Sequence, residues 1–472
     1  MSLAQALLRT KAIDTDLTRD RGLKRVLGAW DLTLLGVGAI IGAGIFVLTG
    51  ITAATMTGPA IVLSFVVAGF ACACAALSYA EMAASIGGCG SAYGYGYASL
   101  GEFPAWIIGW MLICEYGVAI PAVSAGWSGY AVNGLAAIGV ELPAALTAAP
   151  AAGGLINLPA FLVVLVLGGL LAVGAKVSSQ FNAIMVAVKV AAIAIFIGVA
   201  FFHVEFSNWT PFIPEAITRE DGSNAFGVAG IFTGAATIFF AYLGFDAVST
   251  AAEETRNPAR DLPIGILGSL FACTALYILV SGLLTGIVPY TELNVASPVA
   301  HALLKIGVEW AAGLISIGAI AGLTTVMLVM YFGLTRILFA MAQDGLLPGF
   351  FGYVNPKTGT PLGSIVVAGL IMLVFAGFVP LGRLAEIANI GTLGAFVVVC
   401  FGVVVLRQTR PDLPRPFKTP LSPLIPVLGV LSCGFLMSQL SGHTWTAFLG
   451  WMGIGIALYF LYGQRHSRLS AA

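Results

Sequence analysis

The chain has 472 residues, of which 59% are hydrophobic and only 9% are charged, with 21 basic and 21 acidic residues. A water-soluble domain carries about 25% charged residues, so this composition excludes a soluble globular fold and indicates a protein surrounded by lipid. The balanced charge gives no indication of a nucleic-acid partner.

The first thirty residues are a polar segment that precedes the first long apolar run. No cleavable signal is recognisable before that run, so we expect the run itself to act as an uncleaved insertion signal. Residues 1–30 are therefore predicted to be a cytoplasmic N-terminal tail.

The apolar runs that follow are long enough to cross a bilayer. A hydrocarbon core about 30 Å thick requires roughly 20 apolar residues per helix. By this measure the sequence predicts an all-α membrane protein with twelve transmembrane helices. Their expected ranges are 31–52, 59–85, 104–135, 158–176, 180–202, 226–250, 263–288, 311–342, 362–380, 384–406, 422–440 and 444–463.

The basic residues predict the orientation of these spans. Twelve spans place both termini on one side, and with cytoplasmic termini almost all Lys and Arg residues outside the spans are cytoplasmic. Only Arg219, Lys305 and Arg383 then face outward. We expect a multi-pass protein of the cytoplasmic (plasma) membrane with both termini in the cytoplasm.

The first and sixth spans are interrupted by glycines. The first contains Gly38, Gly42 and Gly44, and the sixth contains Gly244 within the run 239–245. Each of these spans opens a group of five. Paired interruptions at corresponding positions of two halves are typical of an inverted repeat with its binding site near the bilayer midplane. The alternative is that the glycines only permit close packing of helices.

This pairing predicts how the chain is divided. Residues 31–202 would form the first inverted repeat, with helices 1 to 5. Residues 203–407 would hold an extracellular loop and the second repeat, with helices 6 to 10. Residues 408–472 would add helices 11 and 12 and a cytoplasmic C-terminal tail.

Broken helices offer backbone groups to a small zwitterion inside a membrane. Amides that begin a helix attract an anion, whereas carbonyls that end one accept from a cation. We expect the first break to bind a carboxylate and the second to bind an ammonium. The assigned residues are Ile40, Ile41, Gly42, Ala43 and Gly44 in the first span and Phe240, Ala241 and Leu243 in the sixth. The Phe240 ring can also cover the ligand, although an aromatic ring in a membrane helix is more often packing.

Lys189 lies near the centre of the fifth predicted span. Its nearer boundary is about 13 Å away at 1.5 Å per residue, too far for the ammonium to reach water easily. Loss of water favours the neutral amine, so this lysine can change protonation near neutral pH and is the predicted proton-coupling residue. The alternative is a permanently charged lysine held by backbone carbonyls.

Glu115 is a second ionisable residue at membrane depth. It is assigned to the substrate site, where it would polarise the ligand ammonium or relay a proton, and the alternative is a protonated packing residue. Asp246, Glu81 and Glu386 lie nearer the ends of spans and favour gate or packing roles.

Motifs of enzymes are absent from the sequence. No HExxH, GxSxG or GxxxxGK[ST] motif occurs, and the glycine-rich stretch 87–91 lacks GxGxxG spacing. The seven cysteines form no CxxC pair and the four histidines are scattered, so buried apolar cysteines are expected and no metal or other cofactor is. The sequence does not indicate an accessory subunit.

Three segments together resemble the amino acid, polyamine and organocation (APC) transporter superfamily, and within it bacterial relatives of the cationic amino acid transporters. They are the runs 38–46, 240–246 and 253–265. The resemblance spans nearly the whole chain. It implies a LeuT-like five-plus-five inverted repeat with broken helices 1 and 6, substrate held at both breaks, and alternating access.

The resemblance also bears on coupling. In proton-driven members of this superfamily a lysine on the fifth helix stands where sodium-coupled relatives hold an ion, and Lys189 lies in a similar context. Ala43 departs from the pattern, because relatives often have Ser or Thr there, so a hydroxyl contact to the carboxylate is lost.

These observations predict a secondary transporter for L-amino acids, in contact with membrane lipids, that imports its substrate together with a proton. Small neutral substrates are favoured over arginine and lysine because Glu115 alone could face a cationic side chain. Sodium-coupled symport, with Thr324 and Thr325 as hydroxyl donors to the ion, is the first alternative, and sodium-independent exchange is the second. A channel or a non-transporting amino-acid sensor is the alternative from another class.

Overall fold

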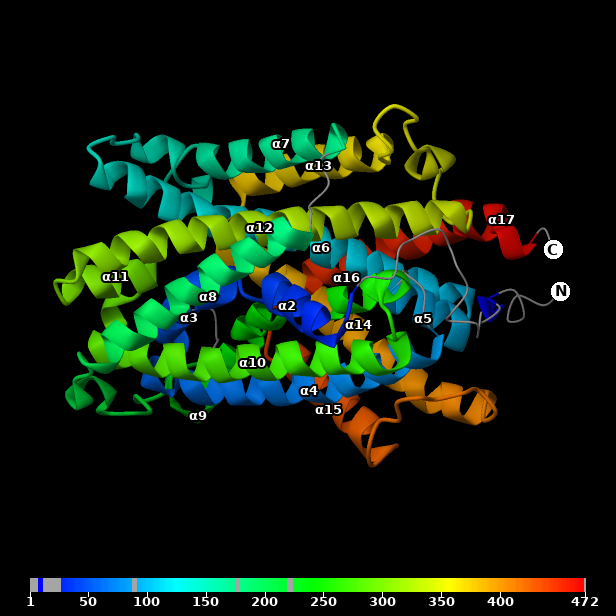
Figure 1. The fold of residues 1–472 in the computed structure, drawn as a ribbon, viewed down its shortest axis with the longest axis horizontal. Coiled ribbons are helices and arrows are strands. Elements are labelled where there is room, and N and C mark those ends of the chain that lie inside the picture. Colours follow the sequence, from blue (N-terminus) through cyan, green and yellow to red (C-terminus); the bar gives the residue numbers. More distant parts are fainter. Residues whose placement is uncertain (1–6, 12–26, 87–90, 175–178, 219–223, 471–472) are drawn as a thin grey trace.

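The structure is a computed structural model that describes residues 7–11, 27–86, 91–174, 179–218 and 224–470. Its long helices run roughly along the longest axis of the molecule, and the described residues nearest the two termini, 7–11 and 464–470, lie at the same end of it (Figure 1). The described strands, β1 (Ile217–Thr218) and β2 (Asn224–Ala225), form one short antiparallel pair. The architecture is therefore helical, as predicted.

The described α-helices range from 3 to 36 residues in length. Those of the first half are α2 (Ala29–Ile40), α3 (Thr49–Thr52), α4 (Ile61–Ile86), α5 (Ser91–Ser99), α6 (Glu102–Ala137), α7 (Leu158–Ala172) and α8 (Ser179–Phe201). Those of the second half are α9 (Gly227–Ile238), α10 (Pro258–Ile287), α11 (Pro298–Lys305), α12 (Glu309–Gln343), α13 (Leu362–Phe378), α14 (Leu381–Thr409), α15 (Leu424–Ser438), α16 (Gly442–Leu458) and α17 (Gln464–His466).

Short 3-10 and π-helical segments join or interrupt these helices. The π-helices are η1 (Gly44–Leu48), η2 (Ala53–Thr57) and η11 (Tyr459–Gly463). The 3-10 segments are η3 (Gly58–Ala60), η4 (Ala144–Leu146), η5 (Pro150–Ala152), η6 (Phe206–Trp209), η7 (Phe239–Tyr242), η8 (Phe245–Glu254), η9 (Tyr290–Glu292), η10 (Gly349–Gly352) and η12 (Arg468–Ser470).

Helix is present in every range that the sequence predicts to cross the membrane. Within the described residues, 8 helical segments are long and apolar enough to span a bilayer, one of which, Gly44–Ile86, joins the end of the first predicted span to the second. The shorter apolar helices are α2, α7, α13 and α15. Several spanning segments bury less than half of their most apolar window, so they present apolar side chains outward, as lipid requires.

Small residues allow the helices to approach closely. A Cβ added at Gly36 of α2 would lie 2.4 Å from the Ser269 Oγ atom of α10, and one at Gly318 of α12 would lie 2.4 Å from the Ala192 Cβ atom of α8. Within lipid, helices associate through such close packing rather than through hydrophobic burial. The contacts bring α2, α8, α10 and α12 together around the centre of the molecule (Figure 1).

Two acidic residues near the ends of spans have packing partners. Glu81 accepts two hydrogen bonds from the Arg407 guanidinium, at 2.9 and 2.7 Å, and one from the Thr419 backbone N–H at 2.8 Å. Glu386 accepts from the hydroxyls of Ser441 and Thr444. These contacts tie α4 and α14 to the segments that follow α14.

The described cysteines are free thiols and all of them are buried, as the sequence predicts. Cys89 and the rest of the glycine-rich stretch 87–90 lie outside the described residues, as does most of the predicted N-terminal tail.

Candidate functional site

The first predicted interruption is present between α2 and the π-helix η1. The last hydrogen bond of α2 runs from the Ile41 N–H to the Val37 carbonyl at 3.1 Å, and Ile41 is extended with φ −71° and ψ 100°. The helix resumes with a bond from the Phe46 N–H to the Gly42 carbonyl at 3.4 Å. The first amides of the resumed helix therefore have no partner within it, and an anion can bind there.

The second predicted interruption follows α9. A 3-10 turn, η7, ends at Tyr242, and the chain then passes through Gly244, which is left-handed with φ +105°. A Cβ at Gly244 would also lie 2.9 Å from the Ala39 carbonyl oxygen, so glycine is required there for conformation and for space. The side-chain amide of Asn389 donates to the carbonyls of Ala236 and Thr237 at 2.8 and 3.0 Å, which satisfies the end of α9.

The two interruptions lie directly against each other. A Cβ at Gly44 would lie 2.3 Å from the Ala241 Cα atom, so only a glycine allows this approach. The Tyr277 hydroxyl of α10 lies 3.0 Å from the Ile40 carbonyl oxygen and 2.8 Å from that of Ala241, and it bridges the two breaks. Opposed helix ends and a bridging hydroxyl therefore form one structural unit.

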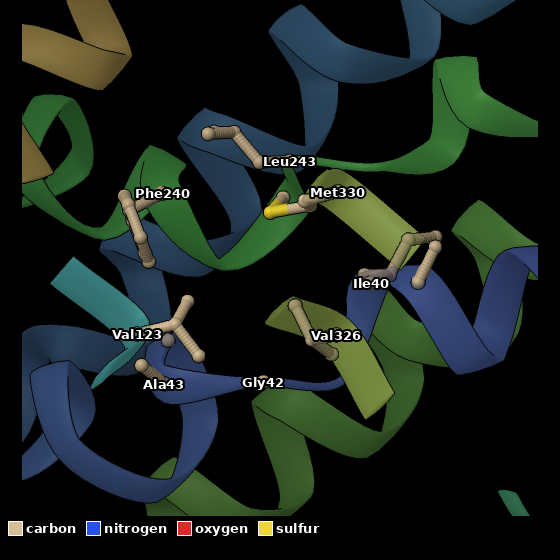
Figure 2. Close-up of a pocket in the computed structure, with 10 residues that line it drawn as sticks. Ile40, Gly42, Ala43, Val123, Phe240, Leu243, Val326 and Met330 are labelled. Carbon is tan, nitrogen blue, oxygen red and sulfur yellow. The ribbon is translucent and has the colours of Figure 1, made fainter. Parts of the chain in front are cut away.

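A small pocket lies between the breaks, as Figure 2 shows. Its lining residues are Ala39, Ile40, Gly42, Ala43, Gly44, Val123, Phe240, Leu243, Val326 and Met330. The cavity volume is about 10 Å³, which holds about one water molecule. The pocket must therefore widen before it can take a ligand the size of an amino acid.

Six of the residues that the sequence assigns to the substrate site line this pocket, namely Ile40, Gly42, Ala43, Gly44, Phe240 and Leu243. Ile41 and Ala241 do not line it, and their carbonyls accept hydrogen bonds from Lys189 and Tyr277. Glu115 does not line it either.

Lys189 is fully buried at the side of the first break. Its ammonium donates to the Gly38 carbonyl and, at 3.1 Å, to the Ile41 carbonyl. Its alkyl chain packs on α12, where a Cβ at Gly322 would lie 3.3 Å from the Lys189 Cδ atom. The positive charge therefore sits at the C-terminal end of α2, where the helix dipole favours a cation.

Glu115 lies on α6 and is fully buried. In the part of the chain that the structure describes, neither of its carboxylate oxygens has a hydrogen-bond partner. It is close enough to Asp246 for the two carboxyl groups to interact electrostatically. The structure thus brings Glu115 together with Asp246 of η8 rather than with the pocket.

Several residues of this region were not predicted from the sequence. Val123, Val326 and Met330 line the pocket from α6 and α12, but each is one apolar residue among many in an apolar helix. Tyr277 and Asn389 donate hydrogen bonds to backbone carbonyls at the breaks. The one sign of either residue in the sequence is that it is polar and lies inside an apolar run.

A multi-pass helical protein in which two broken helices meet at an internal pocket, beside a buried ammonium, has the architecture of a membrane transporter. A family model described as amino acid permease matches residues 27–460. The chain belongs to this family, which is part of the APC superfamily, and the resemblance found in the sequence is confirmed.

Characterised relatives support the same class. The chain is 50% identical to the branched-chain amino acid permease BcaP of Bacillus subtilis (strain 168), over 96% of both chains. It is 45% identical to the methylthioribose transporter of the same organism, over 98% of this chain and 99% of the relative. It is 38% identical to the vacuolar cationic amino acid transporter 2 of Arabidopsis thaliana, over 94% of this chain and 69% of the relative. The prediction of a transporter rather than an enzyme is confirmed.

Proposed function

We propose that this chain imports L-amino acids with small or branched apolar side chains, in symport with a proton, by alternating access. The observation that carries the proposal is the pair of opposed helix breaks on one apolar pocket, with the Lys189 ammonium bound at the first break. This arrangement offers separate partners to each charge of a zwitterion.

The backbone supplies the polar contacts in this proposal. The amides of Gly42, Ala43 and Gly44 would bind the substrate carboxylate at the start of the resumed helix. Phe240 and Leu243 line the other side, and their carbonyls would bind the ammonium. The carbonyls of Ile40 and Ala241 already accept from Tyr277, and we assign them to holding the breaks together.

The apolar lining supports an uncharged substrate side chain. Val123, Val326 and Met330 lie where a side chain would project, and none of them can satisfy a guanidinium or an ammonium. One relative is named a branched-chain amino acid permease, and this name supports the same choice of substrates. A second candidate is methylthioribose, since a relative of similar identity is named for it and its thioether would suit this lining. Methylthioribose has neither a carboxylate nor an ammonium, so competition experiments separate the two candidates.

Lys189 is the proposed proton carrier. When charged, its ammonium holds the carbonyls of Gly38 and Ile41 at the end of α2. A neutral amine is a weaker donor without attraction to the helix dipole, so deprotonation would loosen α2 from α8. A sodium ion would need the carbonyl oxygens that Lys189 occupies, which disfavours sodium coupling. The Thr325 hydroxyl, a predicted sodium ligand, donates to the Gly322 carbonyl at 2.8 Å.

We further propose that the shorter helices α2, α7, α13 and α15 complete twelve spans, with α2 continuing through η1 across the bilayer. Residues 31–202 and 203–407 would be the two LeuT-like repeats, residues 408–472 the added pair of helices with the C-terminal tail, and residues 1–30 the cytoplasmic N-terminal tail. The described residues nearest the termini, 7–11 and 464–470, lie at one end of the molecule, and Arg9 and Lys11 form ion pairs there, which supports a cytoplasmic assignment of that end at the plasma membrane (Figure 1).

Transport into reconstituted liposomes tests this function. Purified protein would be supplied with radiolabelled L-valine under an imposed pH gradient, a sodium gradient or neither. We expect saturable uptake that an inward acid gradient accelerates and a sodium gradient does not. Unlabelled L-leucine and L-alanine should compete, and L-arginine and methylthioribose should not. Uptake that follows only the sodium gradient would contradict the proposal.

A matched pair of lysine variants tests the role of Lys189. Lys189→Ala should still exchange labelled for unlabelled L-valine but should lose acceleration by the acid gradient. Lys305→Ala is the control, because Lys305 is half exposed and forms an ion pair with Glu292 at 3.0 Å outside the spans. Undiminished accumulation in Lys189→Ala would remove Lys189 from coupling. Strict one-for-one exchange in the wild type would identify an exchanger, binding without flux a sensor, and unsaturable flux a channel.

A further inference from the structure

A second group of buried polar side chains lies just beyond the break that follows α9. Glu115 of α6 and Asp246 of η8, which we call the inner carboxylate pair, are 0% and 1% exposed. Asp246 directly follows the first residue of η8, so its position depends on how the chain leaves the break. The pair lies outside the pocket lining.

The inner carboxylate pair has few hydrogen-bond donors. The Tyr116 hydroxyl donates to Asp246 Oδ2 at 3.1 Å. Among the described residues, Asp246 Oδ1 and both oxygens of Glu115 have no hydrogen-bond partner. The Thr392 hydroxyl lies beside Glu115 but donates to the Ala388 carbonyl at 3.0 Å.

The titratable groups near the pair belong to α4 and α6, and none of those described is a cation. Tyr79 of α4, and Cys114 and Tyr116 of α6, lie within electrostatic range of one or both carboxyl groups, and Tyr95 of α5 lies within range of Tyr79. The ion pairs among the described residues include neither Glu115 nor Asp246.

Tyr79 gives an independent sign that a bound species belongs at this position. Its side chain is fully buried, and its hydroxyl has no hydrogen-bond partner among the described residues. That hydroxyl interacts electrostatically with both Asp246 and Glu115. A buried hydroxyl without a partner, within electrostatic range of two carboxyl groups, leaves room in the hydrogen bonding of this region for a bound species.

Two ionised carboxylates cannot remain side by side in a dry, low-dielectric region without a cation. One bound proton removes one charge and supplies a donor between the two acids, as in other carboxyl pairs that share a proton. We propose that the inner carboxylate pair is a second proton-binding site of this protein, distinct from Lys189, and that the closed-pocket conformation holds a proton there.

Other buried carboxylates of the chain show what an ionised acid requires. Glu81 has the Arg407 guanidinium at 2.7 Å. Glu102 has Arg9 at 3.8 Å and accepts from the hydroxyls of Tyr97 and Tyr459 at 3.1 and 3.0 Å. Among the described residues the inner carboxylate pair has no ion-pair partner, and only Asp246 accepts from a hydroxyl, so binding a proton is its route to a lower charge.

The position of the pair suggests how proton release is linked to transport, and this step rests on the proposed function. If α9 and η8 move when the transporter opens, Asp246 moves relative to Glu115 on α6. Water would then reach both acids, and the proton would leave to that side of the membrane. Whether the pair holds a proton would therefore depend on whether α9 and η8 have moved apart from α6.

Infrared spectroscopy of the resting protein in liposomes tests the bound proton without any transport assay. A protonated carboxyl group absorbs at a carbonyl frequency separate from that of a carboxylate. At neutral pH we expect the wild type to show this protonated band and the double variant Glu115→Gln, Asp246→Asn to lack it. The amide bands of the same spectra report whether the variant is folded, and each single variant supplies a second measurement if the double variant is not.

Controls separate the possible explanations. Glu309→Gln, which changes an exposed carboxylate at the start of α12, should keep the band, as should Lys189→Ala. The proposal is overturned if the wild type has no protonated band at neutral pH, or if the double variant keeps it. A band that disappears when sodium or potassium is added would assign the pair to a metal cation and would also overturn it. Failure of amino-acid transport would contradict the proposed function but would leave this result unchanged.

Discussion

Replacing Tyr277 by Phe removes the hydroxyl that joins the two helix breaks. That oxygen lies 3.0 Å from the Ile40 carbonyl oxygen and 2.8 Å from the Ala241 carbonyl oxygen, and the side chain is 0% exposed. The variant loses a hydrogen bond and leaves two buried acceptors without this donor. An unsatisfied buried acceptor costs about 1–3 kcal/mol, and since one hydroxyl proton serves both carbonyls, we expect a loss of that size for the pair.

Tyr277→Phe should also weaken substrate binding. Without the bridge, the first and second breaks are free to separate, and backbone groups aligned for one ligand lose their relative position. A loss of about 1.4 kcal/mol in binding corresponds to a tenfold weaker affinity, which is the size of effect we expect for L-valine.

Tyr331→Phe is the matched control for this experiment. The Tyr331 hydroxyl is also buried and also donates to a backbone carbonyl, that of Ile365 at 2.7 Å, but this bond joins α12 to α13 away from the breaks. The unfolding temperature in detergent should be lower in both variants than in the wild type. Substrate binding, measured by the upward shift of the unfolding temperature with L-valine, should weaken only in Tyr277→Phe. Equal binding in the two variants would refute the role of the bridge.

Three further substitutions test the site. Gly44→Ala places a Cβ 2.3 Å from the Ala241 Cα atom, so we expect overpacking of about 1–3 kcal/mol, a lower unfolding temperature and reduced uptake; wild-type uptake would contradict the close approach. Val326→Phe should narrow the pocket, so that L-alanine competes better than L-leucine in uptake assays, and an unchanged order of competitors would place the side chain elsewhere. Asn389→Ala leaves the Ala236 carbonyl without its donor and should lower the unfolding temperature by an amount equivalent to about 1–3 kcal/mol, whereas unchanged stability would show that another group replaces it.

The breaks could be predicted because the backbone at a break requires glycine, which is visible in the sequence. A positive φ and a close backbone approach favour glycine, and Gly244 and Gly44 meet those conditions. Lys189 was equally visible, because a charge inside an apolar run must have a partner at membrane depth. Its actual partners, the carbonyls of Gly38 and Ile41, required the fold.

The hydrogen-bond partners of individual carbonyls could not be predicted from the sequence. From the sequence, a carbonyl freed by a break is expected to be available to a ligand. In the fold, however, a buried carbonyl can also accept from a side chain of another helix. Tyr277 comes from a different helix and takes the carbonyls of Ile40 and Ala241, and no spacing along the chain predicts that encounter. The meeting of Glu115 with Asp246 is likewise a property of helix packing.

Short helices between the long apolar ones were also not predicted. Periodicity and length identify long apolar helices, whereas α5 and α11 have 9 and 8 residues and resemble loops in composition. Pro298 at the start of α11, after Ser297, is the helix-initiation signal that could have located it.

In the proposed mechanism the opposed backbone breaks bind a zwitterion, and a crystal structure with L-valine bound would show whether they do. We predict density for the carboxylate at the amides of Gly42, Ala43 and Gly44, and for the ammonium at the carbonyls of Phe240 and Leu243. A ligand bound elsewhere, or one whose charged groups are held by side chains while both breaks remain empty, would contradict the account.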